Sequence, residues 1–578
     1  MLDSVAGPRG GQAATTAARR RVTRRAGRDE RALAACTALV GLYLLATLAL
    51  PLYVLLSKSF EDRQGAFVGL ANYATYFSTP ALFNSVYNSL TVAAISTAIT
   101  VALAFVYAYA LTRSCMPFKG AFRVIALVPI LVPSLLPGIG LIYLFGNQGM
   151  LKGLLLGHGI YGPLGIVIAE VFYTFPHALI IITTALALAD ARLYEAAVAL
   201  RAGRPRIFRT VTLPGVRYGL ISAAFVVFTL VITDFGAPKV IGGQYNVLAV
   251  DIYKQVIGQQ NFQMGAVVGV VLLVPAVAAF LVDRLVQRRQ VALLSTRAVP
   301  YEPRPGRRFD LAMLAFCSLV AVFLLGILAV CQYAALVTFW PYNLELSLKN
   351  YRFDLMDGGG WESYTNSIRM ALYTAAFGTG IIFVGAYLVE KGRGLGAARG
   401  ALQFLAMMPM AVPGLVLGLA YIFFFNNPAN PLNFLYGGMA ILVISTITHF
   451  YTVAHLTAVT ALKQMDPEFE AVSASLRQPV HRMFCRVTVP VCLPAILDIS
   501  IYLFVNAMTT VSAVVFLYSP STTLASVAVL NMDDAGDIAP AAAMGMMIFY
   551  TNAVVRLLHA ALTRGVLRRT QAWRVRAA

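Results

Sequence analysis

Ionisable side chains inside long apolar segments are the residues of this sequence best placed to do chemistry. Glu170 and His177 fall in one such segment, and His449 and His455 fall in another. Side chains of these types transfer protons or ligate metal ions. Because His449 and His455 are six positions apart, they lie on different faces of a helix and do not form a metal site by themselves. We therefore expect packed, hydrogen-bonded residues near a pathway, with no metal site and no catalytic residue.

A second polar set lies where two apolar segments end. Thr233 and Asp234 end one segment, and Asn506, Thr509 and Thr510 occupy the equivalent place in another. A carboxylate at membrane depth is a candidate functional group, which would make these five residues the lining of a polar pathway. Asp234 could instead pair with Lys239 or cap a loop. Both interpretations stay open at this point.

The composition identifies the solvent that these segments face. Hydrophobic residues make up 59% of the 578 positions, only 12% are charged, and the mean hydropathy is +0.73. A soluble chain needs more charge than this to cover its surface, so the apolar excess must face lipid. The net charge of +20 lies in short segments between apolar runs, a pattern that argues against nucleic-acid binding. The six scattered cysteines are interpreted as small apolar fillers.

The apolar runs predict an all-α membrane protein with about twelve transmembrane helices in two tandem, parallel six-helix repeats. The predicted spans are 33–57, 89–112, 123–147, 159–189, 217–234, 262–283, 310–338, 367–389, 401–426, 433–462, 493–516 and 541–563. The predicted organisation is a basic tail (1–32), a first transmembrane unit (33–283), a Pro-containing linker (284–309), a second transmembrane unit (310–563) and a basic tail (564–578).

Charge asymmetry predicts the orientation. Of the 45 Lys and Arg residues, all but eight fall on one side of the predicted spans. Basic loops stay on the cytoplasmic side, so both termini should be cytoplasmic. The exceptions are Lys58, Arg63, Lys152, Lys239, Lys254, Lys349, Arg352 and Arg369.

A duplicated segment relates the halves. Residues 200–214 (LRAGRPRIFRTVTLP) match residues 476–490 (LRQPVHRMFCRVTVP), and seven positions are identical. Each copy lies between the fourth and fifth spans of its half. Asp190 and Asp466 are suitable N-caps for a short helix before each copy. Such a capped, basic, aromatic-bearing loop suits insertion into a groove of a partner, and two copies suit a paired partner.

The segment from Glu195 to Pro214 resembles the EAA loop of binding-protein-dependent ABC importer permeases, the MetI-like family. The resemblance implies that the loops dock on two copies of an ABC ATPase subunit and transmit its closure. It also implies a periplasmic solute-binding protein as a partner and a place in the bacterial inner membrane. The loop residues that it singles out are Glu195, Ala196, Ala197, Arg201, Phe208, Pro214, Glu470, Arg477, Phe484 and Pro490. We expect Phe208 and Phe484 to be offered outward to the ATPase.

The sequence departs from the family pattern at two places. The loop glycine of the family is Arg201 in the first copy and Arg477 in the second. The glycine would supply the left-handed turn that ends the helix, so its loss puts the turn geometry in doubt. The family glutamate is Glu195 in the first copy but Ala471 in the second, where Glu470 precedes it.

A finer resemblance concerns the transported solute. Residues 231–243 and 508–523 look similar to permeases for 2-aminoethylphosphonate, and ferric iron permeases are the second resemblance. The phosphonate is the expected substrate, and ferric iron is the alternative. No G-x-x-x-x-G-K-[ST] string is present, so we expect no cofactor on this chain and ATP use by the partner subunit. A secondary carrier also favours two six-span halves, but it has no need for duplicated docking loops.

Prolines inside two predicted spans and a cluster of acidic residues outside the spans lead to two further expectations. Pro129, Pro133 and Pro137 should break the third span, and Pro409 and Pro413 the ninth, which favours a gate at these breaks. Asp533, Asp534 and Asp537 are expected to form an external loop, either solvated or in contact with a receptor.

Overall fold

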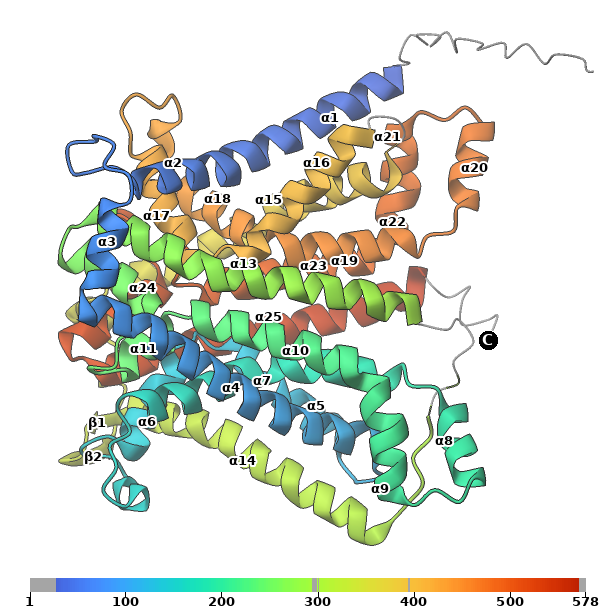
Figure 1. Cartoon of the computed structure of the whole chain (residues 1–578), viewed down its shortest axis with the longest axis horizontal. Helices are drawn as coiled ribbons and strands as arrows, with labels where there is room; N and C mark the ends of the chain where they lie inside the picture. The colour runs from blue at the N-terminus through green and yellow to red at the C-terminus, as the bar shows by residue number, and fades with distance from the viewer. Residues whose placement is uncertain (1–27, 294–298, 300, 393–395, 571–578) are drawn as a thin grey trace, which may run out of the picture.

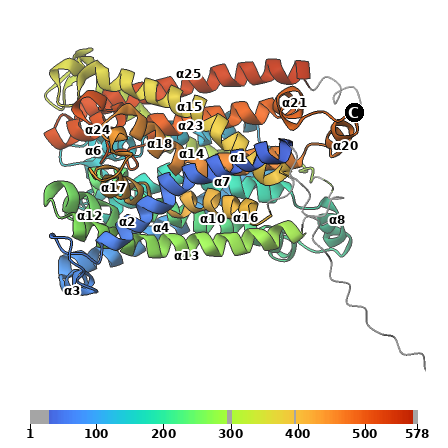
Figure 2. The same ribbon diagram turned by 90° about the horizontal axis from the view of Figure 1, so that it is seen from above.

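The computed structural model describes residues 28–293, 299, 301–392 and 396–570, which form a bundle of long helices with a common direction (Figures 1 and 2). Among these residues, eight helices are long and apolar enough to cross a membrane, and four bent helix pairs bring the possible number of spans to twelve. Large apolar side chains such as Leu39, Leu319 and Leu557 are exposed on the flanks of the long helices, where lipid would cover them. The predicted all-α membrane fold with tandem repeats is confirmed.

Within its described residues, the first half contains thirteen α-helices. They are α1 (Arg28–Leu44), α2 (Leu50–Lys58), α3 (Ala71–Ser78), α4 (Pro80–Arg113), α5 (Lys119–Ala126), α6 (Leu135–Phe145), α7 (Pro163–Ala187), α8 (Ala191–Ala199), α9 (Arg204–Ile207), α10 (Leu213–Thr233), α11 (Gly236–Ile241), α12 (Leu248–Tyr253) and α13 (Phe262–Leu293). A π-helical turn joins α1 to α2, so they form one continuous span (Asp29–Lys58).

The second half repeats this order and adds a short hairpin after its first span. Its elements are α14 (Arg307–Leu336), β1 (Val337–Phe339), β2 (Asn343–Leu346), α15 (Gly360–Lys391), α16 (Gly396–Met407), α17 (Gly414–Phe425), α18 (Met439–His449), α19 (Tyr451–Lys463), α20 (Glu468–Ser475), α21 (Val480–Met483), α22 (Val489–Val491), α23 (Leu493–Thr509), α24 (Ala525–Ala535) and α25 (Ile538–Thr570). The strands β1 and β2 pair antiparallel.

The third span of each half is sharply broken. The helical segments on either side of the break meet at 103° in the first half and at 114° in the second. Pro129 and Pro133 lie at the first break, and Pro409 and Pro413 lie at the second. Proline removes a backbone donor and crowds the preceding turn, so the predicted breaks have a direct cause. Pro137 lies in the first turn of α6, where a helix tolerates proline, and does not contribute a break.

The first span of each half packs against the other half. α2 lies along α17, and α14 lies along α6. Gly140 of α6 is so close to α14 that an added Cβ would be 2.9 Å from the Cys331 sulfur. On the other side, the Tyr43 hydroxyl is 3.1 Å from the Thr448 hydroxyl. The two halves are therefore interlocked, although the chain passes through them one after the other.

The two ends of the bundle differ in what they carry. α8, α9, α20 and α21 lie at one end, which we call the loop end, and β1, β2, α3 and α24 lie at the opposite end, which we call the hairpin end (Figure 1). α13 continues through Leu293 and α14 begins at Arg307, so helix extends well into the segment expected as an irregular linker. Of the predicted tails, residues 1–27 and 571–578 lie outside the described residues.

Candidate pathway and coupling loops

A polar stripe runs along α7 in the interior of the first half. Glu170, Tyr173 and His177 are spaced by three and four residues, which places them on one helix face. The Glu170 side chain is fully buried. The Tyr173 and His177 rings lie 6.0 Å apart. Helix α7 therefore presents a carboxyl, a phenol and an imidazole along a single line.

Asp234 meets this stripe from the end of α10. Its carboxyl lies near the Ser134 hydroxyl and near enough to Glu170 to act on it electrostatically, and neither carboxyl oxygen of Glu170 has a hydrogen-bond partner among the described residues. It also accepts a hydrogen bond of 2.9 Å from the backbone N–H of Ala237, which caps α11. Of the two interpretations of Asp234, the cap is therefore present, whereas Lys239 pairs with Asp534 instead. We call Glu170 and Asp234 the acid pair.

The second half contributes hydroxyls and an amide but no acid at the matching place. Asn506 and Thr509 donate to backbone carbonyls of their own helix, at Tyr502 and Val505 respectively, and Thr233 in α10 does the same toward Thr229. Thr510 is buried, and its carbonyl accepts from Ser526. The structure thus places all five predicted pathway residues at the ends of α10 and α23, and it joins only Asp234 to a second ionisable group.

Two tyrosines near the acid pair were missed by the sequence analysis. Tyr173 lies on the Glu170 face of α7, and Tyr502 of α23 is close enough to influence it electrostatically from the other half. The only available signal was the spacing of three residues between Glu170 and Tyr173. A tyrosine in an apolar helix is otherwise indistinguishable from an ordinary packing residue.

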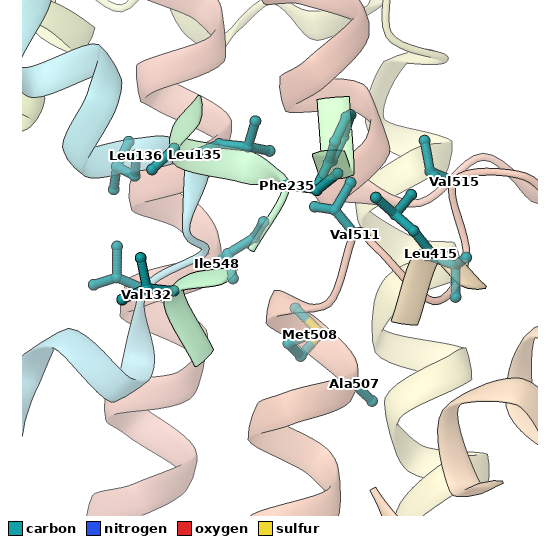
Figure 3. Close-up of a cluster of buried hydrophobic side chains, with 14 of the residues drawn as sticks. Val132, Leu135, Leu136, Phe235, Leu415, Ala507, Met508, Val511, Val515 and Ile548 are labelled. Carbon is teal, nitrogen blue, oxygen red and sulfur yellow. The ribbon is translucent and has the colours of Figure 1, made fainter. Parts of the chain in front are cut away.

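Apolar side chains from both halves close the space beside the acid pair. Phe235 follows Asp234 directly, and Val511 follows Thr510 at the equivalent place of the second half (Figure 3). Leu135 and Leu415, which lie in the first turns of α6 and α17 after the two proline breaks, belong to the same cluster (Figure 3). All four side chains are nearly or fully buried. Buried apolar side chains from both halves therefore meet at the two proline breaks.

The coupling loops, defined as residues 190–214 and 466–490, begin with the predicted caps. The Asp190 carboxylate accepts from the N–H of Arg192, and that of Asp466 accepts from the N–H of Glu468. Arg201 and Arg477 then adopt left-handed backbone conformations, with φ of 55° and 49°. Both loops therefore contain the left-handed turn for which the family uses glycine, and in this chain an arginine adopts that conformation.

The orientation of the loop aromatics differs from the prediction. The Phe208 ring packs against Phe105 and Tyr109 of α4, with a centroid distance of 6.0 Å to each. The Phe484 ring packs against Phe383 and Tyr387 of α15, at 5.9 and 4.8 Å. Both rings are half-buried and face their own transmembrane helices. The expectation that they are offered outward is wrong, because an apolar ring beside an aromatic-rich helix end is buried there rather than in solvent.

Other side chains of the loops face outward. Leu200 and Leu476, at equivalent positions, are 82% and 64% exposed, and Leu193 and Phe469 form a second exposed equivalent pair. Glu470 contacts Lys391 at 2.7 Å. Of the remaining predicted loop residues, Ala197 is buried, and Glu195, Ala196, Arg201, Pro214, Arg477 and Pro490 are exposed.

The predicted acidic loop at the hairpin end is largely helical. Asp533 and Asp534 lie in the last turn of α24, and only Asp537 follows it. Asp534 pairs with Lys239 of α11 at 2.7 Å, which links the two halves. Burial and the neighbouring Asp534 raise the pKa of Asp533 to about 7. The expectation of a plain external loop is therefore corrected.

The histidines of the second half do not come together. His449 ends α18, whereas His455 lies in α19 and hydrogen-bonds to Gln403 at 2.9 Å. Within the described part of the chain, no group of three or more His, Cys, Asp or Glu side chains is arranged to hold a metal ion.

Up to twelve possible spans among the described residues, two interlocked halves and a duplicated loop at one end are typical of a polytopic transport protein. Residues 116–291 and 370–568 match the family described as the binding-protein-dependent transport system inner membrane component. The chain belongs to this family of ABC importer permeases, with one family unit in each half.

Individual relatives agree with this assignment. The ferric transport system permease protein FbpB of Actinobacillus pleuropneumoniae is 28% identical over 470 residues, which cover 78% of this chain and 67% of that protein. A Haemophilus influenzae protein, whose name assigns it provisionally to ferric transport, is 29% identical over 73% of this chain and 68% of its own length. The molybdenum transport system permease protein ModB of Mycobacterium tuberculosis is 29% identical over 36% of this chain and 79% of its own length.

Proposed function

We propose that this chain forms the whole translocation pathway of an ATP-driven importer. Two ATPase subunits would dock on the two coupling loops, and a solute-binding protein would deliver its cargo at the hairpin end. The loop end, with the start of α1 and the end of α25, would then lie in the cytoplasm. The chain would bind no cofactor and hydrolyse no ATP itself.

The outward face of each loop supports this assignment of partners. Leu193 and Leu200 in the first loop, and Phe469 and Leu476 in the second, leave apolar surface uncovered at equivalent positions. Apolar side chains on a short exposed helix suit insertion into a groove of a partner protein. Because the two loops repeat the same pattern, they fit two identical grooves. Leu200 and Leu476 take over the docking role that the sequence analysis gave to Phe208 and Phe484.

For the solute we propose a cation, namely ferric iron. The observation that carries this proposal is the acid pair, with Glu170 fully buried beside Asp234 and two tyrosines close by. Carboxylate and phenolate oxygens are hard donors, which suit a hard, highly charged metal ion. A pathway must release what it binds, so a site with few ligands suits transfer better than a storage site would. The two ferric permeases among the relatives agree with this choice.

The competing solute is 2-aminoethylphosphonate, which residues 231–243 and 508–523 favoured. Its phosphonate is an anion, and any negative charge on the acid pair would repel it. Its ammonium group alone would be attracted. The charge of the acid pair therefore favours ferric iron over the phosphonate more clearly than the sequence similarity of residues 231–243 and 508–523 favours the phosphonate.

Uptake by cells tests the proposed solute. We would measure accumulation of radiolabelled ferric iron and of labelled 2-aminoethylphosphonate in cells that lack the chain and in cells that carry it, or its Glu170→Gln or Asp234→Asn variant, from a plasmid. The chain should restore iron uptake, and both variants should lower it by about tenfold, an effect expected for a group that contacts the solute. Glu61→Gln, at the hairpin end, serves as the control. Restored phosphonate uptake without restored iron uptake would overturn the choice of solute.

A further inference from the structure

The two coupling loops contact the second span of their own half through residues at equivalent positions. On α4 the contacted residues are Phe105, Tyr109 and Arg113, spaced four residues apart in the last three turns. On α15 they are Phe383, Tyr387 and Lys391, with the same spacing and the same place in the helix. Residues four apart lie on one helix face, so each second span presents two aromatic rings and a terminal cation to its loop.

The aromatic half of each contact is the same in both loops. Phe208 lies edge-on to Tyr109, with an interplanar angle of 81°, and Phe484 lies in a similar way on Tyr387, at 68°. Rings at these distances and angles attract one another beyond the area that they bury. Each loop is thus attached to its second span where the loop turns toward the fifth span.

The ionic half of each contact uses different chemistry at equivalent positions. In the first half, the Arg113 guanidinium lies over the ring of Tyr194 in α8, 5.2 Å from the centroid, and donates a 2.8 Å hydrogen bond to the carbonyl of Leu186. In the second half, Lys391 forms a 2.7 Å ion pair with Glu470 of α20. Tyr194 and Glu470 hold the same place in their loops, 14 residues before Phe208 and Phe484. A cation–π contact thus replaces an ion pair.

The chain segment between the halves completes the first contact. The Tyr301 ring lies beside the Tyr194 ring on the same side of Arg113, with its centroid 4.4 Å from the guanidinium carbon and 4.7 Å from the Tyr194 centroid. The N–H of Ala191 donates to the carbonyl of Val299 at 2.9 Å, so the same segment holds the start of α8. Beside the second loop lies the start of α1 instead, where the Asp29 carboxylate accepts from the N–H of Val480 at 3.3 Å, and the Glu470 carboxylate supplies the attraction to the cation.

The second spans lead from these contacts to the pathway. On α4, Thr100 hydrogen-bonds to Thr174 of α7, the residue after Tyr173, at 3.2 Å. On α15, Gly378 is so close to α23 that an added Cβ would be 2.9 Å from Leu503, the residue after Tyr502. Rigid packed helices of this kind carry a displacement from one end to the other.

We propose that Arg113 and Lys391 are positioning residues that join the coupling loops to the second spans, and that these joints transmit the motion of the ATPase to the pathway. The first joint consists of Phe208, Tyr194, Tyr301 and Arg113 with the two rings of α4. The second joint consists of Phe484, Glu470 and Lys391 with the two rings of α15. The proposal rests on the proposed ATPase partnership but not on the identity of the solute.

Charge reversal in the second joint tests the proposal. In the complex of the chain with its ATPase subunits and binding protein, reconstituted in liposomes, we would measure ATP hydrolysis, solute transported per ATP and co-purification of the ATPase. Lys391→Glu should leave co-purification unchanged and lower transport per ATP by roughly tenfold, within the range seen for residues that link coupled sites. Adding Glu470→Lys, which restores an ion pair of reversed polarity, should return most of the coupling. A merely structural role would lower assembly and thermal stability together, and the reversed pair would not restore coupling alone.

Two further variants make the result decisive. Lys463→Glu serves as the matched control, because Lys463 and Glu390 form a more exposed, 3.9 Å contact at the same end of the bundle. Tyr301→Ala should uncouple the first loop without any change of charge. Normal transport per ATP in Lys391→Glu and in Tyr301→Ala would overturn the proposal that the joints transmit the motion of the ATPase. Failure of the parent complex to hydrolyse ATP at all would instead refute the proposed ATPase partnership.

Discussion

Gly236 lies directly against Ser134 in the first half, and in the second half Ser512 lies directly against Gly414. Gly236 and Ser512 follow α10 and α23 at equivalent positions, whereas Ser134 and Gly414 lie at the two proline breaks. A Cβ added to Gly236 would overlap the Ser134 hydroxyl and lie 3.0 Å from the backbone nitrogen of Leu135. Each half thus has one glycine and one serine at this contact, but the two residues have exchanged places.

Because glycine and serine have exchanged places between the halves, we expect the stability lost in one variant to be restored by a second substitution. Gly236→Ser should overfill the contact beside Asp234 and lower stability by about 1–3 kcal/mol, the usual cost of overpacking. The double variant Gly236→Ser with Ser134→Gly reproduces the arrangement of the second half and should recover most of the loss. The melting temperature of the detergent-solubilised protein measures both effects. Gly380→Ala, at a position with open space, is the control. Equal instability of the single and double variants would contradict the interpretation.

The left-handed arginines at the two loop turns predict that replacement by glycine stabilises the protein. The left-handed conformation costs a non-glycine residue roughly 1–2 kcal/mol, and glycine avoids this cost. Arg201→Gly and Arg477→Gly should therefore raise the melting temperature slightly and leave ATPase co-purification nearly unchanged. Arg201→Ala keeps the Cβ atom and should bring no such gain. If alanine and glycine have the same effect, the arginine side chain matters more than the backbone.

The ion pair between Lys239 and Asp534 predicts an effect on the gate. It joins the two halves at the hairpin end, with the Asp534 side chain 41% exposed, so its contribution should be less than about 1 kcal/mol. Lys239→Met should shift the balance toward the outward-open state by only a few-fold, which basal ATP hydrolysis of the reconstituted complex would report. Lys58→Met removes a 2.6 Å pair within one half and is the matched control. Equal changes in both variants would argue against a role for the Lys239 pair in gating.

Asp533 predicts a pH dependence of stability. Its pKa is raised from 3.8 to about 7, first by burial and then by the nearby Asp534. Between these values the folded protein holds a proton that the unfolded chain has lost, so the free energy of unfolding should fall as the pH rises through this window. The melting temperature should drop by a few degrees from about pH 5 to pH 7.5, and Asp533→Asn should flatten the profile. Asp357→Asn, an exposed acid at the same end, should leave the slope intact.

Local signals in the sequence predicted the elements, and long-range packing decided what they contact. The apolar runs, the prolines at 129, 133, 409 and 413, and the caps Asp190 and Asp466 act within a few residues, so their effects are visible in one sequence. The predicted fifth span of the second half, 493–516, was too long. Helix α23 ends at Thr509, and the chain then turns beside the second proline break. Apolar residues in that turn are as hydrophobic as a span but are buried, mainly against α17 and α18 of their own half and, at Phe516, against Tyr253 of the first half.

The site was predicted less completely than the fold. Phe208 belongs to a recognisable motif, but only the neighbouring rings of Phe105 and Tyr109 show that it faces inward. The contact between Glu170 and Asp234 joins residues 64 positions apart, and nothing in their spacing reveals it. Tyr301 lies in a segment interpreted as an irregular connector, and its stacking on Arg113 depends on where α4 ends.

The most direct test of the central claim is the energy source of transport. The purified chain would be placed in liposomes with and without its ATPase subunits, with the loaded binding protein on the outside, and solute uptake would be followed. We predict uptake only when both ATPase subunits and internal ATP are present, and none with a proton or sodium gradient alone. Uptake driven by an ion gradient in the absence of the ATPase would contradict the account and identify the chain as a secondary carrier.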